Sequence, residues 1–196
     1  GEDRHIDFEA EGTKYGNYGE DIKQYPYDTK RLKAVLAGAA QMADWNRKLP
    51  KGHGLGISVH RSFASYVACA VEVSSDARGN IKLEHFWLSV DCGKAVNPER
   101  IKSQMEGAAI FGASIAFYGE ITAKDGVIEQ GNFDDYPLAR MTDIPEIDVE
   151  ILAVDAPPGG VGEPGVPPVA PTICNAIFNA TGKRYRELPL SKYKII

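Results

Sequence analysis

The chain has 196 residues, which is enough for one domain with a sizeable core and marginal for two. Its net charge of −5 argues against a nucleic-acid-binding protein, which needs clustered Lys and Arg, and no apolar run approaches the length of a membrane span. Apolar residues make up 43% and charged residues 25%, as in an ordinary globular protein. The three cysteines, Cys69, Cys92 and Cys174, form no C-x-x-C and so exclude the usual zinc and iron–sulfur spacings.

The first residues differ in character from the rest. Residues 1–27 are polar, rich in Gly and Tyr and without a clear period, so we expect an extended leading segment that lies on something else. Residues 28–196 are expected to form the folded domain. The sequence opens at Gly1 without Met or an apolar signal stretch, which indicates a cut precursor or a start within a longer protein. The compartment therefore stays open between cytoplasm and periplasm.

The first half of the domain predicts a helix followed by strands. Asp28 is a candidate N-cap, and the apolar residues after it recur at helical spacing, which predicts an amphipathic helix over 29–45. A short strand is expected over 55–60. Alternating side chains predict a strand over 65–73, and a turn at Gly79-Asn80 joins it to a strand over 81–90 as a hairpin.

The second half predicts two further helices. Asn97 followed by Pro98 is a strong helix start, and the apolar face continues to Tyr118. The remaining elements are a hairpin turning at Asp125-Gly126, a strand over 147–154 and a helix over 170–180 that stops at Gly182. This order is typical of an α+β fold with a mixed or antiparallel sheet and packed helices.

A Gly/Pro-rich loop over residues 157–168 contains one carboxylate, Glu163. Prolines fix φ and glycines permit unusual backbone paths, so such a loop can be stiff and can approach a bulky ligand closely. A helix begins just after the loop, and its N-terminal N–H groups favour an anion. If partly desolvated, Glu163 can act as a general base near neutral pH. The alternative interpretation is a connector with a solvated Glu.

A second cluster runs from Asp91 to Pro98 and continues into the helix as Gln104-Met105-Glu106-Gly107. The Gln104 amide can both donate and accept hydrogen bonds, which suits the edge of a heterocycle. The small residues that follow indicate close contact with another backbone or a ligand. The alternative interpretation is a surface Gln near a helix start.

Together these motifs resemble one family. Asp91-Cys-Gly-Lys-Ala-Val-Asn-Pro, Gln104-x-Glu-Gly107 and Gly160-Val-Gly-Glu163-Pro are similar to the C-terminal part of the molybdopterin-binding subunit of the xanthine dehydrogenase/aldehyde oxidase family. Two longer stretches look most like the isoquinoline 1-oxidoreductase β-subunit branch of this family. They are Gly159-Gly-Val-Gly-Glu-Pro-Gly-Val-Pro-Pro and the segment from Asn175 to Lys183. The resemblance covers the chain from about Tyr27 onward.

The resemblance implies a function for both clusters. Glu163 matches the family's catalytic base in the hydroxylation of an N-heteroaromatic or aldehyde carbon, and Gln104 matches the glutamine that contacts the pterin. Gly107, Gly160 and Gly162 are expected beside the cofactor, a molybdopterin cytosine dinucleotide with molybdenum. The expected partners are the N-terminal portion of the molybdenum subunit and a small subunit with [2Fe-2S] clusters, so the chain alone is expected to be inactive. The alternative is a non-catalytic interaction module that retains the fold.

Overall fold

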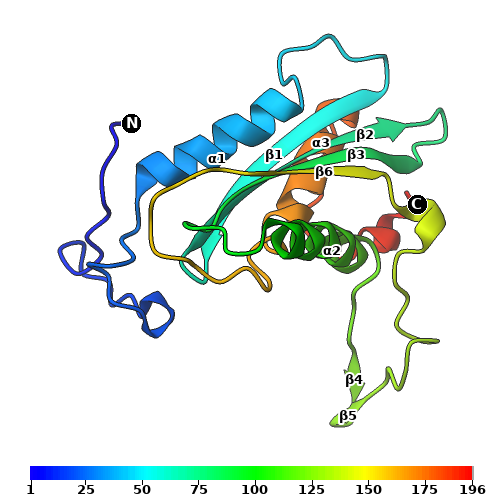
Figure 1. The fold of residues 1–196 in the computed structure, drawn as a ribbon. Coiled ribbons are helices and arrows are strands. Elements are labelled where there is room, and N and C mark those ends of the chain that lie inside the picture. Colours follow the sequence, from blue (N-terminus) through cyan, green and yellow to red (C-terminus); the bar gives the residue numbers. More distant parts are fainter. Residues whose placement is uncertain (196) are drawn as a thin grey trace.

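The computed structural model describes residues 1–195, which are built around a four-stranded mixed sheet in the order β1-β2-β3-β6 (Figure 1). The first three strands are antiparallel neighbours and β6 lies parallel to β3, which confirms the predicted α+β fold with a mixed sheet. The strand bounds are β1 His53–Ser62, β2 Ser65–Ser75, β3 Ile81–Asp91 and β6 Glu146–Ile151.

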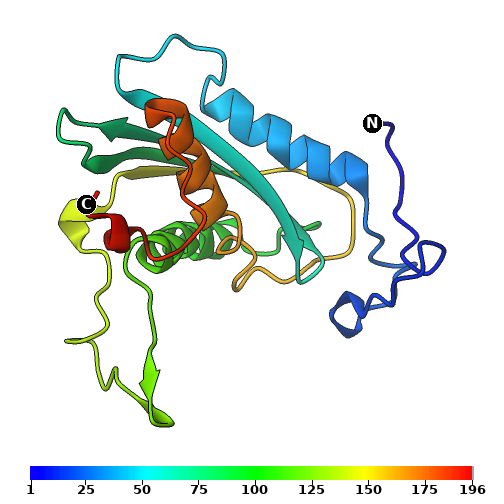
Figure 2. The same ribbon diagram turned by 180° about the vertical axis from the view of Figure 1, so that it is seen from behind.

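Helices cover both faces of this sheet (Figures 1 and 2). Helix α1 (Thr29–Met42) packs on one face, and α2 (Pro98–Phe117) and α3 (Val169–Thr181) pack on the other. The side chains of β2 alternate between the two layers as the sequence predicts. Tyr66, Ala68 and Ala70 contact the α1 side, whereas Val67, Cys69, Val71 and Val73 enter the larger core under α2 and α3.

Helix ends follow local chemistry. The Asp28 side chain accepts a hydrogen bond from the Lys30 N–H at 2.7 Å, which confirms the predicted N-cap of α1. This helix stops at Met42 rather than residue 45, and Asp44 just beyond it has a positive φ of 43°. Asn97 caps α2 by accepting from the Arg100 N–H at 3.2 Å, and Gly182 ends α3 in the left-handed conformation.

Strand β6 ends at Ile151, three residues before the predicted end at 154. The reason is its partner. Ile151 pairs with Val90, and β3 ends one residue later at Asp91, so no ladder remains for the following residues. The chain then leaves the sheet as the Gly/Pro-rich loop.

The leading segment is attached to the body of the same chain. Arg61, only 4% exposed, donates to the Tyr15 hydroxyl at 2.7 Å and to the Tyr25 carbonyl at 3.0 Å. Its guanidinium lies over the Tyr27 and Tyr66 rings, 5.2 and 5.5 Å from their centroids. Residues 1–27 therefore pack on the end of the sheet, although the division of the chain into 1–27 and 28–196 stays a prediction.

A slender arm projects from the body after α2 (Figures 1 and 2). It contains the hairpin of β4 (Ala123–Lys124) and β5 (Val127–Ile128), which confirms the predicted turn at Asp125-Gly126. Both turn residues have positive φ, 52° and 80°, as a two-residue hairpin loop requires. Short 3-10 turns occur at Asn17–Gly19, Met141–Asp143 and Leu190–Tyr193. Among residues 1–195, no helix combines the length and apolar character needed to cross a bilayer.

Candidate functional site

The Gly/Pro-rich loop is held against the ends of three strands. The Gly159 N–H donates to the Cys92 carbonyl at 2.8 Å, and the Gly160 N–H donates to the Phe63 carbonyl at 2.7 Å. The Ser65 hydroxyl donates to the Gly160 carbonyl at 2.7 Å. These bonds fix the approach to Glu163 through backbone atoms, so the loop is an ordered part of the fold.

The β1–β2 turn beneath the loop has an unusual backbone. Phe63 and Ala64 both have positive φ, 51° and 61°, as a tight hairpin requires at its two central positions. Such conformations cost energy for residues other than Gly and persist where surrounding contacts enforce them. Here the Phe63 carbonyl and ring meet Gly160, where an added Cβ would lie 2.7 Å from the Phe63 Cβ. A side chain at position 160 would therefore collide with Phe63, which explains why this residue is glycine.

Asp91 links the second cluster to the same loop. Its buried carboxylate accepts from Arg31 Nε at 2.8 Å and Nη2 at 2.6 Å, and from the Gly93 N–H at 2.9 Å. Gly93 has a φ of +69°, and an added Cβ would lie 2.2 Å from the Pro157 carbonyl oxygen. Only glycine permits this close approach of the two motifs. Burial, together with the Asp91 charge, raises the pKa of the neighbouring Cys92 thiol.

Helix α2 supports the segment that contains Glu163. Gln104 Nε2 donates to the Gly162 carbonyl at 3.0 Å, so the two sequence motifs meet in space. On the same helix, the next residue, Met105, and Ala108 one turn further on pack against Gly165, where an added Cβ would lie 3.0 Å from the Met105 Sδ. The structure thus brings Gln104 and the Glu163 loop together as one surface.

The Glu163 side chain is exposed, and within residues 1–195 it has no hydrogen-bond partner. The described residues therefore leave this carboxylate accessible to solvent. The backbone N–H groups of Gly162 and Glu163 also donate no hydrogen bond within the same residues. The loop therefore presents a free carboxylate and two free donors to its surroundings.

Gly107 and Gly162 border this surface, and an added Cβ at either would meet nothing within 4 Å. Gly107 is exposed in the middle of α2, where glycine costs about 0.5–1 kcal/mol relative to alanine. No contact in the described residues explains that cost. An open surface with two glycines, an amide side chain and free N–H groups suits a large planar polar group such as a pterin.

The sequence did not predict the residues that hold the Gly/Pro-rich loop and Asp91 in position. Ser65, Phe63 and Arg31 fix the loop or Asp91, and no such role was predicted for any of them from the sequence. Only their structural proximity identifies them. Among residues 1–195, no three His, Cys, Asp or Glu side chains gather as a metal-binding group.

The chain resembles known proteins over most of its length. The sequence profile of the molybdopterin cofactor-binding domain family matches residues 23–145, a range that includes Gln104 and Gly107 and ends before Glu163. Isoquinoline 1-oxidoreductase subunit beta of Brevundimonas diminuta is 34% identical over 161 residues, which cover 80% of this chain and 21% of that protein.

Two further relatives extend the likeness. The protein named membrane-bound aldehyde dehydrogenase (pyrroloquinoline-quinone) of Gluconacetobacter polyoxogenes is 33% identical, over 82% of this chain and 22% of that one. The aldehyde oxidoreductase of Desulfovibrio gigas has a similar structure, with a TM-score of 0.55 and 25% identity over 64% of this chain and 14% of that one. The chain thus spans about a fifth of the length of the curated relatives it matches. It belongs to the molybdopterin cofactor-binding domain family and corresponds to part of the molybdenum-binding subunit of the xanthine dehydrogenase/aldehyde oxidase family.

Proposed function

We propose that this chain forms the base-bearing part of a molybdenum hydroxylase that oxidises an N-heteroaromatic compound or an aldehyde. The observation that carries the proposal is the hydrogen bond from Gln104 to the Gly162 carbonyl. It holds the exposed Glu163 carboxylate beside the open face of α2 that contains Gly107. The names of two relatives, one for isoquinoline and one for aldehydes, support these two substrate classes.

The cofactor in this proposal is a molybdopterin cytosine dinucleotide. Gln104 would hold it by its amide. Gly107 and Gly162 would allow its rings to lie close to the backbone, and Gly160, which packs on Phe63, would border the cofactor and hold the loop in place. When bound, the cofactor supplies the two-electron acceptor and the metal-centred chemistry. The free N–H groups of Gly162 and Glu163 are available to its polar edge.

Glu163 is proposed as the general base. Hydroxylation of a C–H carbon by water adds one oxygen and releases two electrons and two protons, so the attacking oxygen must lose a proton. A carboxylate next to that oxygen can accept it. Because Glu163 is exposed in this chain, the walls that exclude water must come from elsewhere. We assign them to the N-terminal portion of the molybdenum subunit, and the electron exit to [2Fe-2S] clusters on a small subunit.

The test is Glu163→Gln in the enzyme purified with its partner chains. Molybdenum and pterin content should stay near that of the unmodified enzyme because the substitution keeps the size of the side chain. Turnover should fall by at least about 10²–10⁴-fold because the proton acceptor is lost. Glu187→Gln, at an exposed carboxylate far along the chain, is the control and should leave turnover unchanged. Near-normal turnover of Glu163→Gln would remove this residue from the mechanism.

A non-catalytic interaction module with the same fold is the competing proposal. Elemental analysis of the purified assembly separates the two, and pyrroloquinoline quinone should be measured in the same samples because a relative's name contains it. Molybdenum in near-stoichiometric amount supports the hydroxylase. An assembly with its natural partners but without molybdenum would refute it.

A further inference from the structure

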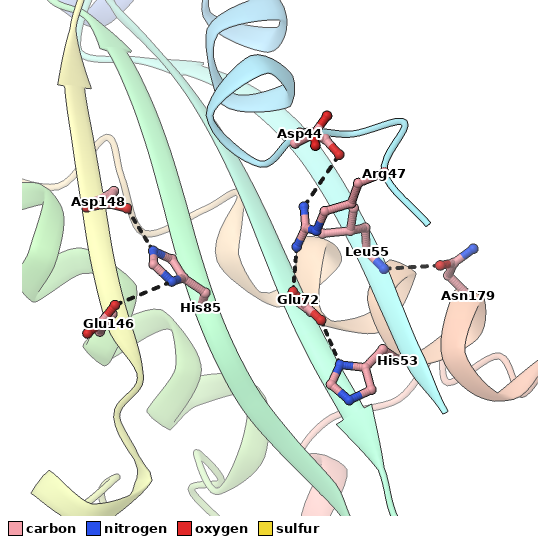
Figure 3. A network of polar contacts seen from close by, with 9 residues as sticks. All are labelled: Asp44, Arg47, His53, Leu55, Glu72, His85, Glu146, Asp148 and Asn179. Atoms are coloured by element: carbon pink, nitrogen blue, oxygen red, sulfur yellow. Dashed lines mark hydrogen bonds and ion pairs between the residues drawn. The ribbon is translucent and has the colours of Figure 1, made fainter. Parts of the chain in front are cut away.

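The two outer edges of the sheet differ. At the β1 edge, Asn179 Oδ1 accepts from the Leu55 N–H at 3.1 Å, and Asn175 Nδ2 donates to the Ile57 carbonyl at 3.2 Å. Both asparagines belong to α3, which packs along β1 (Figure 2). Figure 3 shows the contact of Asn179 with Leu55. Side chains thus occupy backbone groups that another strand would otherwise bind, a common protection of sheet edges.

The β6 edge has no such protection within residues 1–195. The Leu152 N–H donates to the Val90 carbonyl at 2.9 Å, so even-numbered residues of β6 direct their backbone groups to β3. The N–H and C=O groups of Ile147, Val149 and Ile151 consequently point to the open edge. None of them makes a hydrogen bond in the described part of the chain.

The side chains of the same three residues form a half-buried apolar row against the core on the α2 side. An open groove of about 790 Å³ continues this row toward the start of α2. Its lining includes Val149, Ile151, Leu152, Val154, Pro98 and Lys102. An added strand would find apolar contacts on this face of the sheet.

The opposite face of β6 is acidic. Glu146, Asp148 and Glu150 alternate with the apolar residues, and the Glu146 and Asp148 side chains are 89% and 62% exposed. One cation-forming group faces the first two: His85 lies 2.8 Å from Asp148 and 3.8 Å from Glu146 (Figure 3). An incoming strand would therefore gain from Lys or Arg at the positions opposite these carboxylates.

A second copy of this chain does not complement the edge. If two β6 strands paired with their apolar rows on one face, the carboxylates of both would gather on the other face and repel each other. If one copy were inverted, apolar side chains would lie against carboxylates.

We propose that the β6 edge accepts an additional strand from a partner polypeptide in which apolar residues alternate with Lys or Arg. The strand adds its backbone hydrogen bonds to Ile147, Val149 and Ile151, and its two rows of side chains match the groove and the acidic row. This proposal concerns assembly and does not depend on the role of Glu163.

The test measures amide hydrogen exchange in the ¹⁵N-labelled full chain with the synthetic peptide acetyl-Lys-Val-Lys-Val-Lys-Val-amide. At a peptide concentration of about ten times the dissociation constant, exchange at Ile147, Val149 and Ile151 should slow about tenfold. The same peptide with Glu in place of Lys should have little effect. No slowing with the Lys peptide, or equal slowing with both peptides, would overturn the proposal. If exchange at these residues slows as the protein concentration rises in the absence of peptide, the edge instead binds a second copy of the chain, and the proposal of a different partner is wrong.

Two variants sharpen the test. Val149→Pro removes one outward N–H without removing a bond to β3, and proline is tolerated on edge strands, so the peptide effect should disappear. The double change Glu146→Gln and Glu150→Gln keeps the backbone and should weaken the Lys peptide several-fold, whereas Glu187→Gln should not. Unchanged peptide affinity in the double variant would contradict the charge complementarity that defines the partner.

Discussion

At the scale of single residues, two glycines of α2 have different reasons to be glycine. An added Cβ at Gly112 would lie 2.5 Å from the Val169 Cβ, so packing against α3 excludes a side chain there. At Gly107 the same atom would meet nothing within 4 Å. A helical glycine without an internal contact is destabilising. The absent side chain at 107 is therefore consistent with an external group that lies against the helix.

This contrast gives a prediction with a built-in control. Gly107→Ala should raise the unfolding free energy of the chain by about 0.5–1 kcal/mol, because alanine is the better helix former. In the assembled enzyme, the same substitution should lower molybdopterin content. Gly112→Ala should lower the unfolding free energy instead. Urea denaturation and cofactor analysis measure the two effects, and full cofactor content in Gly107→Ala would show that nothing lies against this position.

Sequence motifs identified Glu163 and Gln104 because both belong to spaced Gly-rich patterns, and the structure brings them together. The tight turn at Phe63 and Ala64 was not predictable, because neither residue is of the type that favours positive φ. Its conformation follows from the long-range bonds of the loop to strands β1 and β2. The exposure of Glu163 was likewise hidden, since burial depends on parts of the fold that a local motif does not describe.

At the scale of elements, one ion pair joins α1 to the end of β3. The Asp91 side chain is fully buried and that of Arg31 is 12% exposed, and the pair is bidentate. Asp91 also accepts a hydrogen bond from the Gly93 N–H. Gly93 in turn packs closely against Pro157 of the loop. The position of α1 is in this way connected to the site through two short contacts.

Arg31→Ala should destabilise the chain by about 3–5 kcal/mol, because it leaves a buried carboxylate without its partner. Lys33→Ala removes the exposed pair with Asp3, which solvent screens, and should cost much less than Arg31→Ala. Chemical denaturation of both variants measures the difference. A cost for Arg31→Ala as small as that for Lys33→Ala would mean that Asp91 finds water or another donor when the guanidinium is absent.

Element prediction succeeded where a period is strong and failed where a distant partner decides. The alternation of β2 predicted that its side chains divide between two opposite faces, and the caps at Asp28 and Asn97 predicted two helix starts. The end of β6 was misplaced because it depends on where β3 ends, a fact that β6 itself does not contain.

At the scale of the whole molecule, large apolar side chains are exposed on α2 and on the segment between α2 and β6. This segment contains the arm that projects from the body (Figure 1). The exposed side chains are Phe111, Ile121, Val127, Ile128, Phe133 and Met141. Several large exposed apolar groups along one segment are typical of surfaces that contact another polypeptide. The body of the chain makes its core without them, so they contribute little to its own stability.

The arm should therefore behave differently in the isolated chain and in the assembly. Val127 and Ile128 are 69% and 56% exposed, and replacing both by Thr keeps the β-branched shape that suits a hairpin. The unfolding free energy should change by less than about 0.5 kcal/mol per substitution, and the isolated chain should become more soluble. Co-purification with partner chains should decrease, because an interface loses apolar area. If the double variant instead unfolds more easily and assembles normally, the arm packs on its own body in solution and the partner surface lies elsewhere.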